Sequence, residues 1–448
     1  MKNTKLLYPL LVIIHACIAL AIFVLPILSK LYAFIIPAFG LYYIIKTKNK
    51  NNEVLLVCAY LVGIEVFLRM TGGNFNNEYV KFSLIFFMFV GMIYSSFSPA
   101  SFIYWFFLIL LVPSILITST AVGYDIDVKK MLFFNLSGPV CLGICSIYMY
   151  SRRIELSQLQ NTLSMMGLPI VTTTVYLFLY NPSVKDVVRS TGSNFETSGG
   201  FGPNQVATVL GLGIFIFFTQ LILFSKSIKE MALNGFLLVF ISYRGIVTFS
   251  RGGIITGVVM ILCLLVFLYF FTKGKGKAKF GLVLILTGLM GIAIWTYSSI
   301  QTSGLIEKRY ANKDALGREK KSVLSGREGI MDSEIKLFLD NPILGVGAGM
   351  GKEIRKESGT VIASHNEITR MLAEHGMFGV LGLLILLITP LIFFINNRQH
   401  LYCISFYLFW LLTINHAAMR IAAPAFVYAL SLLSVRIVFP EKATKSDS

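Results

Sequence analysis

The sequence predicts an all-α, polytopic membrane protein, a bundle of about 12–14 transmembrane helices with one long extracytoplasmic loop. Of its 448 residues, 56% are hydrophobic and 14% are charged, whereas soluble chains carry about 25% charged residues. The apolar residues recur in blocks close to the ~20 residues that cross a bilayer. This composition excludes a soluble enzyme, a disordered chain and a nucleic-acid-binding domain.

The apolar blocks define the expected elements in order. They divide the chain into transmembrane helices in 1–299, an extracytoplasmic loop in 300–366, and C-terminal transmembrane helices with a short cytoplasmic tail in 367–448. Within the loop, helical spacing up to Asp340 predicts a surface helix that Asn341-Pro342 ends. The expected spans are 6–25, 29–45, 54–69, 81–97, 101–118, 131–150, 160–180, 204–224, 231–249, 252–272, 280–299, 376–395, 401–416 and 421–439.

The net charge of +17 follows the positive-inside pattern of membrane proteins. Lys and Arg gather in alternate short loops, including Lys46–Lys50, Arg152-Arg153 and Lys273–Lys279, which predicts a cytoplasmic N-terminus and an external 300–366 loop. Anionic lipid head groups are the expected partners of these charges. All six cysteines lie in apolar blocks, so neither a disulfide framework nor a zinc site is indicated.

The residues that could carry chemistry fall in outward-facing turns. They are Thr248-Phe249-Ser250-Arg251-Gly252-Gly253, Ser325-Gly326-Arg327-Glu328, the Asn341–Gly349 stretch with alternating glycines, and His365-Asn366 followed by Glu374, Gly376 and Gly379. A weaker fifth motif is Gly202-Pro203-Asn204-Gln205. The alternating glycines lack the preceding strand and following Lys-Ser/Thr of a phosphate loop, so we expect a flexible turn that lets the backbone approach a ligand.

In order and spacing these motifs resemble the O-antigen polymerase/ligase family, over about residues 200–395. The resemblance implies a GT-C-like glycosyltransferase of the bacterial inner membrane, with its active site facing the periplasm or exterior. Its members transfer a glycan from undecaprenyl diphosphate to an acceptor glycan or lipid A–core. Neither a metal nor another cofactor is implied, and no nucleic acid is expected as a partner.

The resemblance also implies roles for individual residues. Arg251 and Arg327 match the family arginines and would bind the diphosphate, since the planar guanidinium pairs with two oxygens at once. His365 would be the general base for the acceptor hydroxyl. Further substrate-binding candidates are Lys81, Asn204, Arg244 and Asn366.

Simpler roles compete with these assignments. Arg251 could simply be an arginine at a helix end in the membrane interface. Arg327 could simply be one of the solvated charges of its loop. His365 and Asn366 would suit helix capping. An ion pair with Glu65 is the alternative for Arg244, and an i,i+4 pair with Arg370 is expected for Glu374. The remaining features, Asp125-Ile126-Asp127, His15, His400 and His416, are expected to be surface or structural residues.

We favour a polymerase of O-antigen, capsule or exopolysaccharide repeat units, with the O-antigen ligase as the alternative. A polymerase handles two lipid diphosphates, which calls for more cations than Arg251 and Arg327. A lipid-linked glycan flippase is a third possibility, although transporters place ionisable residues near the bilayer midplane. The additional outward basic residues are Arg69, Lys81, Arg189, Arg244, Arg370 and Arg420.

Overall fold

The computed structural model describes residues 4–121, 127–274, 276–320, 322, 327–357, 364–416 and 419–438. Over these residues the chain forms nineteen α-helices, three short 3₁₀- or π-helical turns and two three-residue strands. The α-helices are α1 (Thr4–Val24), α2 (Leu28–Thr47), α3 (Glu53–Met70), α4 (Tyr79–Ser95), α5 (Phe102–Leu110), α6 (Val112–Ala121), α7 (Val128–Met149), α8 (Leu156–Tyr180), α9 (Val184–Val187), α10 (Pro203–Thr219), α11 (Ile228–Ile246), α12 (Arg251–Phe271), α13 (Gly276–Gln301), α14 (Leu305–Tyr310), α15 (Glu328–Asp340), α16 (Met350–Glu357), α17 (Glu367–Asn396), α18 (Cys403–Ile414) and α19 (Ala423–Leu430). The other elements are η1 (Pro99–Ser101), η2 (Glu196–Ser198), η3 (Gln220–Phe224), β1 (Arg153–Glu155) and β2 (Ser434–Arg436).

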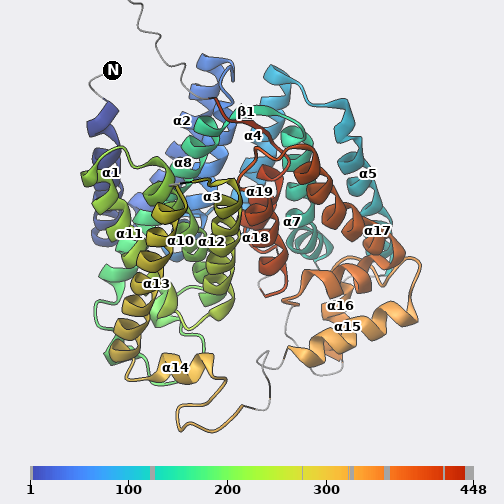
Figure 1. Ribbon diagram of the computed structural model, residues 1–448. Coiled ribbons are helices and arrows are strands. Elements are labelled where there is room, and N and C mark those ends of the chain that lie inside the picture. The colour runs from blue at the N-terminus through green and yellow to red at the C-terminus, as the bar shows by residue number, and fades with distance from the viewer. Residues whose placement is uncertain are drawn as a thin grey trace, which may run out of the picture.

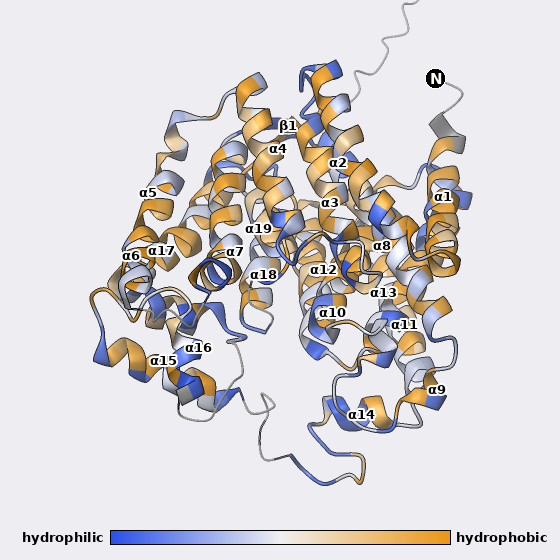
Figure 2. Cartoon of the chain, turned by 180° about the vertical axis from the view of Figure 1, so that it is seen from behind, coloured by the Kyte–Doolittle hydropathy of each residue, from blue (hydrophilic) through white to orange (hydrophobic). Residues whose placement is uncertain are grey.

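The helices form an apolar bundle. Among the described residues, nine helical segments are long and apolar enough to cross a membrane, and α4 and α18 are shorter apolar helices. The hydropathy colouring shows hydrophobic residues along the long helices and more hydrophilic residues at the two ends of the bundle (Figure 2). The all-α, multi-pass membrane fold is therefore confirmed.

The expected span at 101–118 corresponds to one membrane-length apolar segment, Pro99–Thr120. It is interrupted between α5 and α6 at Leu111, just before Pro113, which cannot donate a backbone hydrogen bond. The 421–439 block is wrong as a full span, because α19 ends at Leu430 and the chain continues into β2. β2 pairs in parallel with β1, so residues 434–436 form backbone hydrogen bonds with β1 and do not continue a transmembrane helix.

Close helix packing brings the N-termini of α10 and α12 together. A Cβ atom on Gly211 would lie 2.0 Å from the carbonyl oxygen of Gly253, and one on Gly257 would lie 2.4 Å from that of Gly211. Gly253 and Gly257 have the spacing of small residues that lets membrane helices approach closely. The two helix starts that carry Asn204 and Arg251 are therefore neighbours.

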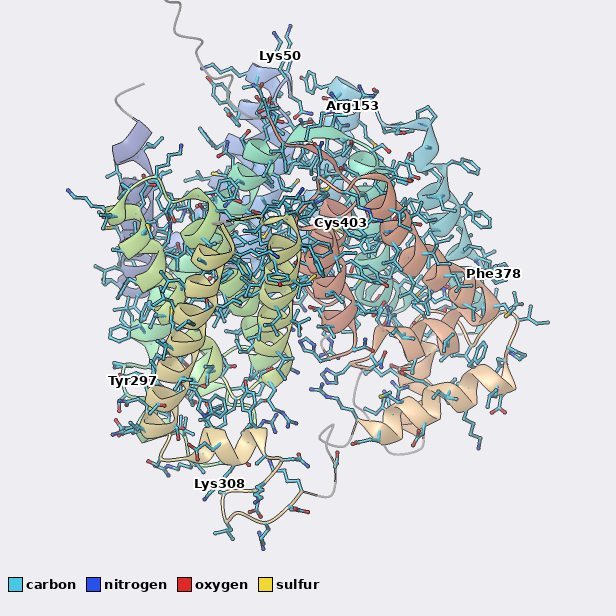
Figure 3. The ribbon with its side chains drawn as sticks, viewed as in Figure 1. Lys50, Arg153, Tyr297, Lys308, Phe378 and Cys403 are labelled. Carbon is cyan, nitrogen blue, oxygen red and sulfur yellow. The ribbon has the colours of Figure 1, made fainter. Side chains whose placement is uncertain are left out.

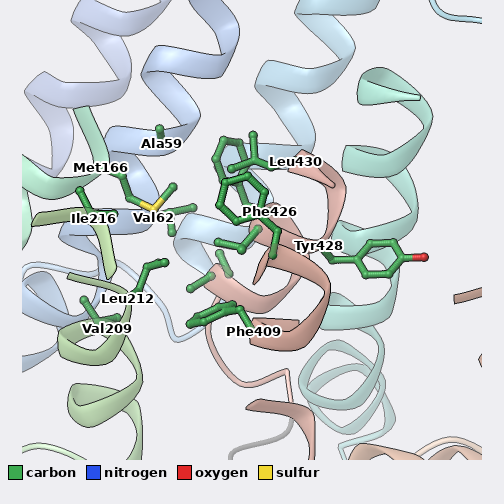
Figure 4. Close-up of a cluster of buried hydrophobic side chains, with 14 of the residues drawn as sticks. Ala59, Val62, Met166, Val209, Leu212, Ile216, Phe409, Phe426, Tyr428 and Leu430 are labelled. Carbon is green, nitrogen blue, oxygen red and sulfur yellow. The ribbon is translucent and has the colours of Figure 1, made fainter. Parts of the chain in front are cut away.

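The centre of the bundle is filled by side chains from five helices. Figure 4 shows Val62 of α3, Met166 of α8 and Leu212 of α10 beside Phe409 of α18 and Phe426 of α19. All five are at most 2% exposed. Since the interior is packed, bound substrates would be expected at its ends or its lipid-facing surface.

The short helices α14, α15 and α16 gather at one end of the bundle, and β1 lies at the opposite end (Figure 1). Figure 3 places Lys50 and Arg153 at the β1 end and Lys308 at the α14 end. Most of the motif residues, Arg244 included, lie near helix ends or in the segments around α14–α16.

Candidate active site

Arg251 is the first residue of α12, directly after a tight turn. Phe249 in that turn has a φ of 59°, and Ser250 donates a hydrogen bond of 2.7 Å from Oγ to Oδ1 of Asn204. This bond fixes the turn to the start of α10. Asn204 therefore positions the Arg251 turn.

Arg309 and Arg327 lie close to Arg251, and Arg420 lies close to Arg327. We call these four residues the arginine cluster. Burial lowers the pKa of Arg309, and the positive charges of Arg251 and Arg327 lower it further. Burial also lowers the pKa of Arg420, and the positive charge of Arg327 lowers it further. This mutual repulsion shows that the four guanidinium groups share one region of positive potential.

Each guanidinium of the cluster is held by a backbone carbonyl. Arg251 donates to the carbonyl of Arg309 at 3.3 Å, and Arg309 donates to that of Phe249 at 3.0 Å. Arg327 donates to the carbonyl of His416 at 3.1 Å, and Arg420 to that of Ser364 at 2.8 Å. A carbonyl orients a guanidinium and leaves its formal charge in place, which suits the binding of an anion.

His365 lies in a small pocket beside the cluster. The pocket has a volume of about 70 Å³, and its lining includes Arg327, Asn366 and His416. Burial lowers the pKa of His365 to about 3, and the charges of Arg420, Arg327 and His416 contribute to this shift. Its Nδ1 atom is buried and has no hydrogen-bond partner within the described part of the chain. Because a buried polar atom without a partner is costly, this nitrogen is a candidate for contact with a substrate.

The site contains His416, which the sequence analysis assigned a structural role. Its ring lies against the Arg251 turn, since a Cβ atom on Gly252 would be 2.5 Å from the imidazole. Its Nε2 atom is 3.4 Å from Oγ1 of Thr208 on α10. His416 thus joins α10, α12 and the end of α18. His416 and Arg309 are residues of this site that the sequence motifs did not identify.

Glu334 holds the backbone around His365. This carboxylate of α15 is 1% exposed, and it accepts hydrogen bonds from Arg355 (3.0 Å), Ser364 (3.2 Å) and Thr369 (2.6 Å). Ser364 is the residue directly before His365. The carboxylate therefore joins α15, α16 and α17 at the point where His365 is presented.

Asn366 caps α17, as its capping alternative predicted. Its Oδ1 atom accepts from the backbone N–H of Ile368 at 2.9 Å and of Thr369 at 3.4 Å. The expected Arg370–Glu374 ion pair is also present at 2.9 Å, and Glu367 forms a second pair with Arg370. Asn366 also lines the His365 pocket.

The glycine-rich turn approaches another segment of the protein, so its expected approach to a ligand is not what the structure shows. A Cβ atom on Gly345, whose φ is 69°, would lie 2.5 Å from the backbone of Glu374. Val346 and Gly347 donate to the carbonyls of Ala373 and Glu374 at 2.9 and 3.1 Å. The turn thus packs against the kink of α17 at Gly376, where φ is 56°.

Two of the substrate-binding candidates lie outside the cluster. Arg244 caps the end of α8 by donating to the carbonyls of Leu177 (2.6 Å) and Asn181 (3.1 Å). The alternative pair of Arg244 with Glu65 is not formed, because Glu65 pairs with Arg69.

Lys81 is buried and forms an ion pair with Glu78. It also donates to the carbonyl of Met419 at 3.4 Å. The remaining motif positions Ser325 and Gly326, and Asp125 and Ile126 of the acidic turn, lie outside the described residues, whereas Asp127 caps α7.

No curated protein matches this sequence. Residues 236–384 match the sequence model of a protein family described as O-antigen ligase. This segment holds Arg251, Arg309, Arg327 and His365, and it ends before His416 and Arg420. The match supports the O-antigen polymerase/ligase family, which the motifs of this segment resemble.

Proposed function

We propose that this protein polymerises undecaprenyl-diphosphate-linked oligosaccharide repeat units of O-antigen, capsule or exopolysaccharide, with the arginine cluster and His365 as its active site. The observation that carries the proposal is the position of His365. Its Nδ1 atom is buried without a partner among the described residues, in a pocket that Arg327 lines. A diphosphate leaving group needs cations, and an attacking hydroxyl needs a base, so the two requirements meet here.

An apolar groove supports a lipid-linked donor. It has a volume of about 440 Å³ between α10, α11, α12 and α13, and α12 contributes Ile254, Ile255, Val258 and Leu262 to its lining. The groove also reaches Tyr310. Burial raises the pKa of Tyr310 to about 12, and the positive charges of Arg251 and Arg309 limit this rise. An isoprenoid tail in this groove would place its diphosphate at the start of α12, beside the cluster.

The proposed step has a simple balance of bonds. The acceptor hydroxyl oxygen attacks the anomeric carbon of the donor glycan, and the bond between that carbon and the diphosphate oxygen breaks. His365 takes the hydroxyl proton, and the lipid diphosphate leaves as an anion bound by the arginines. Because the arginines supply the positive charge, we propose that no metal or nucleotide is needed.

The low pKa of His365 fits this order of events. With a pKa of about 3, the imidazole is neutral at neutral pH, so one ring nitrogen can accept a proton. A bound diphosphate would offset the charges of Arg327 and Arg420, which lower this pKa. Donor binding therefore raises the basicity of His365 when the acceptor arrives.

The number of cations supports a polymerase over the ligase alternative. Besides the arginine cluster, a separate groove at the same end of the protein is lined by Lys129, Lys130 and Lys352. A polymerase binds lipid diphosphates as both donor and acceptor, so it has the greater need for cations outside the donor site. The ligase remains the alternative, since lipid A–core is also phosphorylated.

Deleting the gene separates the two reactions. Loss of a polymerase should leave single repeat units on the cell-surface acceptor. Accumulation of long chains on undecaprenyl diphosphate would instead identify a ligase. Analysis of cell-surface and lipid-linked glycans by gel electrophoresis and mass spectrometry gives both readouts.

We further propose that the α14–α16 end faces the periplasm or exterior of the bacterial inner membrane. Basic residues such as Lys50 and Arg153 lie at the opposite end (Figure 3), as the positive-inside rule requires of a cytoplasmic face. A cysteine-free variant with Lys320→Cys should react with an impermeant maleimide in intact spheroplasts, and one with Gly276→Cys should not. The reverse labelling would overturn the placement of the site.

A further inference from the structure

A second groove lies between α4, α7 and α16, and it ends beside His365. Its outer part has a volume of about 820 Å³, and its inner part reaches Arg370, Ser364 and Arg420. Phe134, Asn135 and Lys352 line both parts. Ser364 lines the inner part and also the His365 pocket. The groove therefore leads from the surface of α7 to the proposed base.

The outer part combines apolar and cationic surfaces. Phe82 of α4 and Phe133 of α7 meet edge to face with ring centroids 5.7 Å apart, and Phe133 is 56% exposed. Lys129, Lys130 and Lys352 lie on the same lining. An amphiphile with an apolar tail and an anionic head matches this combination.

The acidic residues of the groove are engaged elsewhere. Asp127 accepts the backbone N–H of Lys130, and Glu78 pairs with Lys81. Glu353 lies 3.7 Å from Lys356. Across the described ranges, none of the three groove lysines (Lys129, Lys130 and Lys352) forms an ion pair. Lys81 and Lys356 offset Glu78 and Glu353, so among the described residues of the outer lining three lysines face the single remaining carboxylate of Asp127. The groove thus presents net positive charge to a ligand.

We propose that this groove binds the acceptor as a second polyprenyl-diphosphate-linked glycan. Its phosphates lie at the three groove lysines and its tail lies over the phenylalanines. Its glycan follows the open side of the groove to Ser364, since the inner part holds only about 30 Å³, the room of a water molecule. The proposal rests on the polymerase function and names its acceptor class.

The chemistry of polymerisation explains why the two phosphate sites are apart. The donor reacts at the sugar carbon that carries its diphosphate, so that diphosphate must lie beside His365. The acceptor reacts at a hydroxyl of its glycan, so its own diphosphate lies the length of the glycan away. The arginine cluster next to His365 matches the position of the donor diphosphate, and the three groove lysines match that of the acceptor diphosphate.

Farnesyl diphosphate, a short soluble polyprenyl diphosphate, tests this arrangement in the purified full-length protein. Native mass spectrometry should count two bound equivalents on the wild-type protein. One equivalent should remain on the triple variant Lys129→Gln, Lys130→Gln, Lys352→Gln, and one on the double variant Arg251→Gln, Arg327→Gln. The matched control Lys185→Gln, Lys313→Gln, Lys336→Gln removes equal charge from the same end of the protein and should keep two.

Three results would overturn the proposal. They are a single equivalent on the wild-type protein, two equivalents on the groove variant, and displacement of the groove-bound equivalent by phosphatidylglycerol at equal concentration. The last result would identify a phospholipid head-group site. Two bound equivalents in a protein without glycan transfer would instead contradict the polymerase function and leave the second diphosphate site standing.

Discussion

Two sets of cationic side chains in this protein differ in what holds them. In the first set, Arg69, Lys81, Arg355 and Arg370 are buried against carboxylates. In the arginine cluster, every guanidinium donates to a backbone carbonyl of a distant segment. A carboxylate offsets the charge that it orients, whereas the arginines of the cluster lower one another's pKa and so mark a region of positive potential. The first set stabilises the helical framework, and the cluster is suited to a ligand.

The largest expected effect separates the two sets by activity. Arg327→Ala removes one of the cations that bind the diphosphate leaving group. It should reduce the rate of glycan transfer by about 10²–10³-fold, the typical cost of losing an electrostatic contact to the transition state. The variant should unfold at nearly the wild-type temperature. Transfer assays and thermal unfolding of the purified protein give both values, and an unchanged rate would remove Arg327 from the site.

Breaking a pair of the first set should act mainly on stability. Glu334→Ala leaves Arg355 buried and takes the acceptor from Ser364 and Thr369. Removing one partner of a buried ion pair costs about 3–5 kcal/mol, so the α15–α17 region should unfold at a lower temperature. Asp332→Ala, an exposed change on the same helix, is the control. Equal unfolding temperatures in the two variants would contradict the role of Glu334.

A smaller effect tests the contact between the Arg251 turn and His416. Gly252→Ala adds a Cβ atom 2.5 Å from the imidazole, so the two segments must move apart. Displacement by a fraction of an ångström should slow transfer roughly tenfold. Gly281→Ala, where a Cβ atom meets nothing within 4 Å, should transfer at the wild-type rate. Equal rates in both variants would mean that this contact does not position Arg251.

The smallest effect concerns pH. The pKa of His365 lies near 3 and that of His416 near 4, both below the ordinary value of about 6.5. Since kcat/KM reports the free enzyme, lowering the pH from 8 to 5 leaves both rings neutral and should change kcat/KM less than about twofold. A tenfold loss per pH unit below pH 6.5 would show that His365 titrates normally.

Much of the fold could be predicted because the transmembrane signal is local. An apolar block of helix length is visible in any window, and most blocks correspond to helices. The block at 421–439 failed because its apolar residues pack inside the protein: Phe426 and Leu430 are fully buried against neighbouring helices. Burial in protein and burial in lipid select the same residue types, so composition could not separate them.

The site was predictable only where a motif marked it. Arg251, Arg327 and His365 belong to recognisable motifs, and the structure brings them together. Arg309, His416 and Arg420 carry no such signal, since each joins the site through contacts with distant segments. The sequence also could not show which cations have carboxylate partners: Lys81 has Glu78 three residues away, but the partners of Arg355 and the carbonyls around Arg244 come from other helices.

The central claim, that the cluster and His365 carry out glycan transfer, is tested most directly by the triple variant His365→Ala, Arg251→Ala, Arg327→Ala. The variant should be retained in the membrane and unfold at a temperature close to that of the wild type. The measurement is extension of lipid-linked repeat units by protein reconstituted into vesicles. We predict no detectable extension by the triple variant beside full extension by the wild type. Wild-type extension by the triple variant would contradict the assignment of this site and the enzyme function built on it.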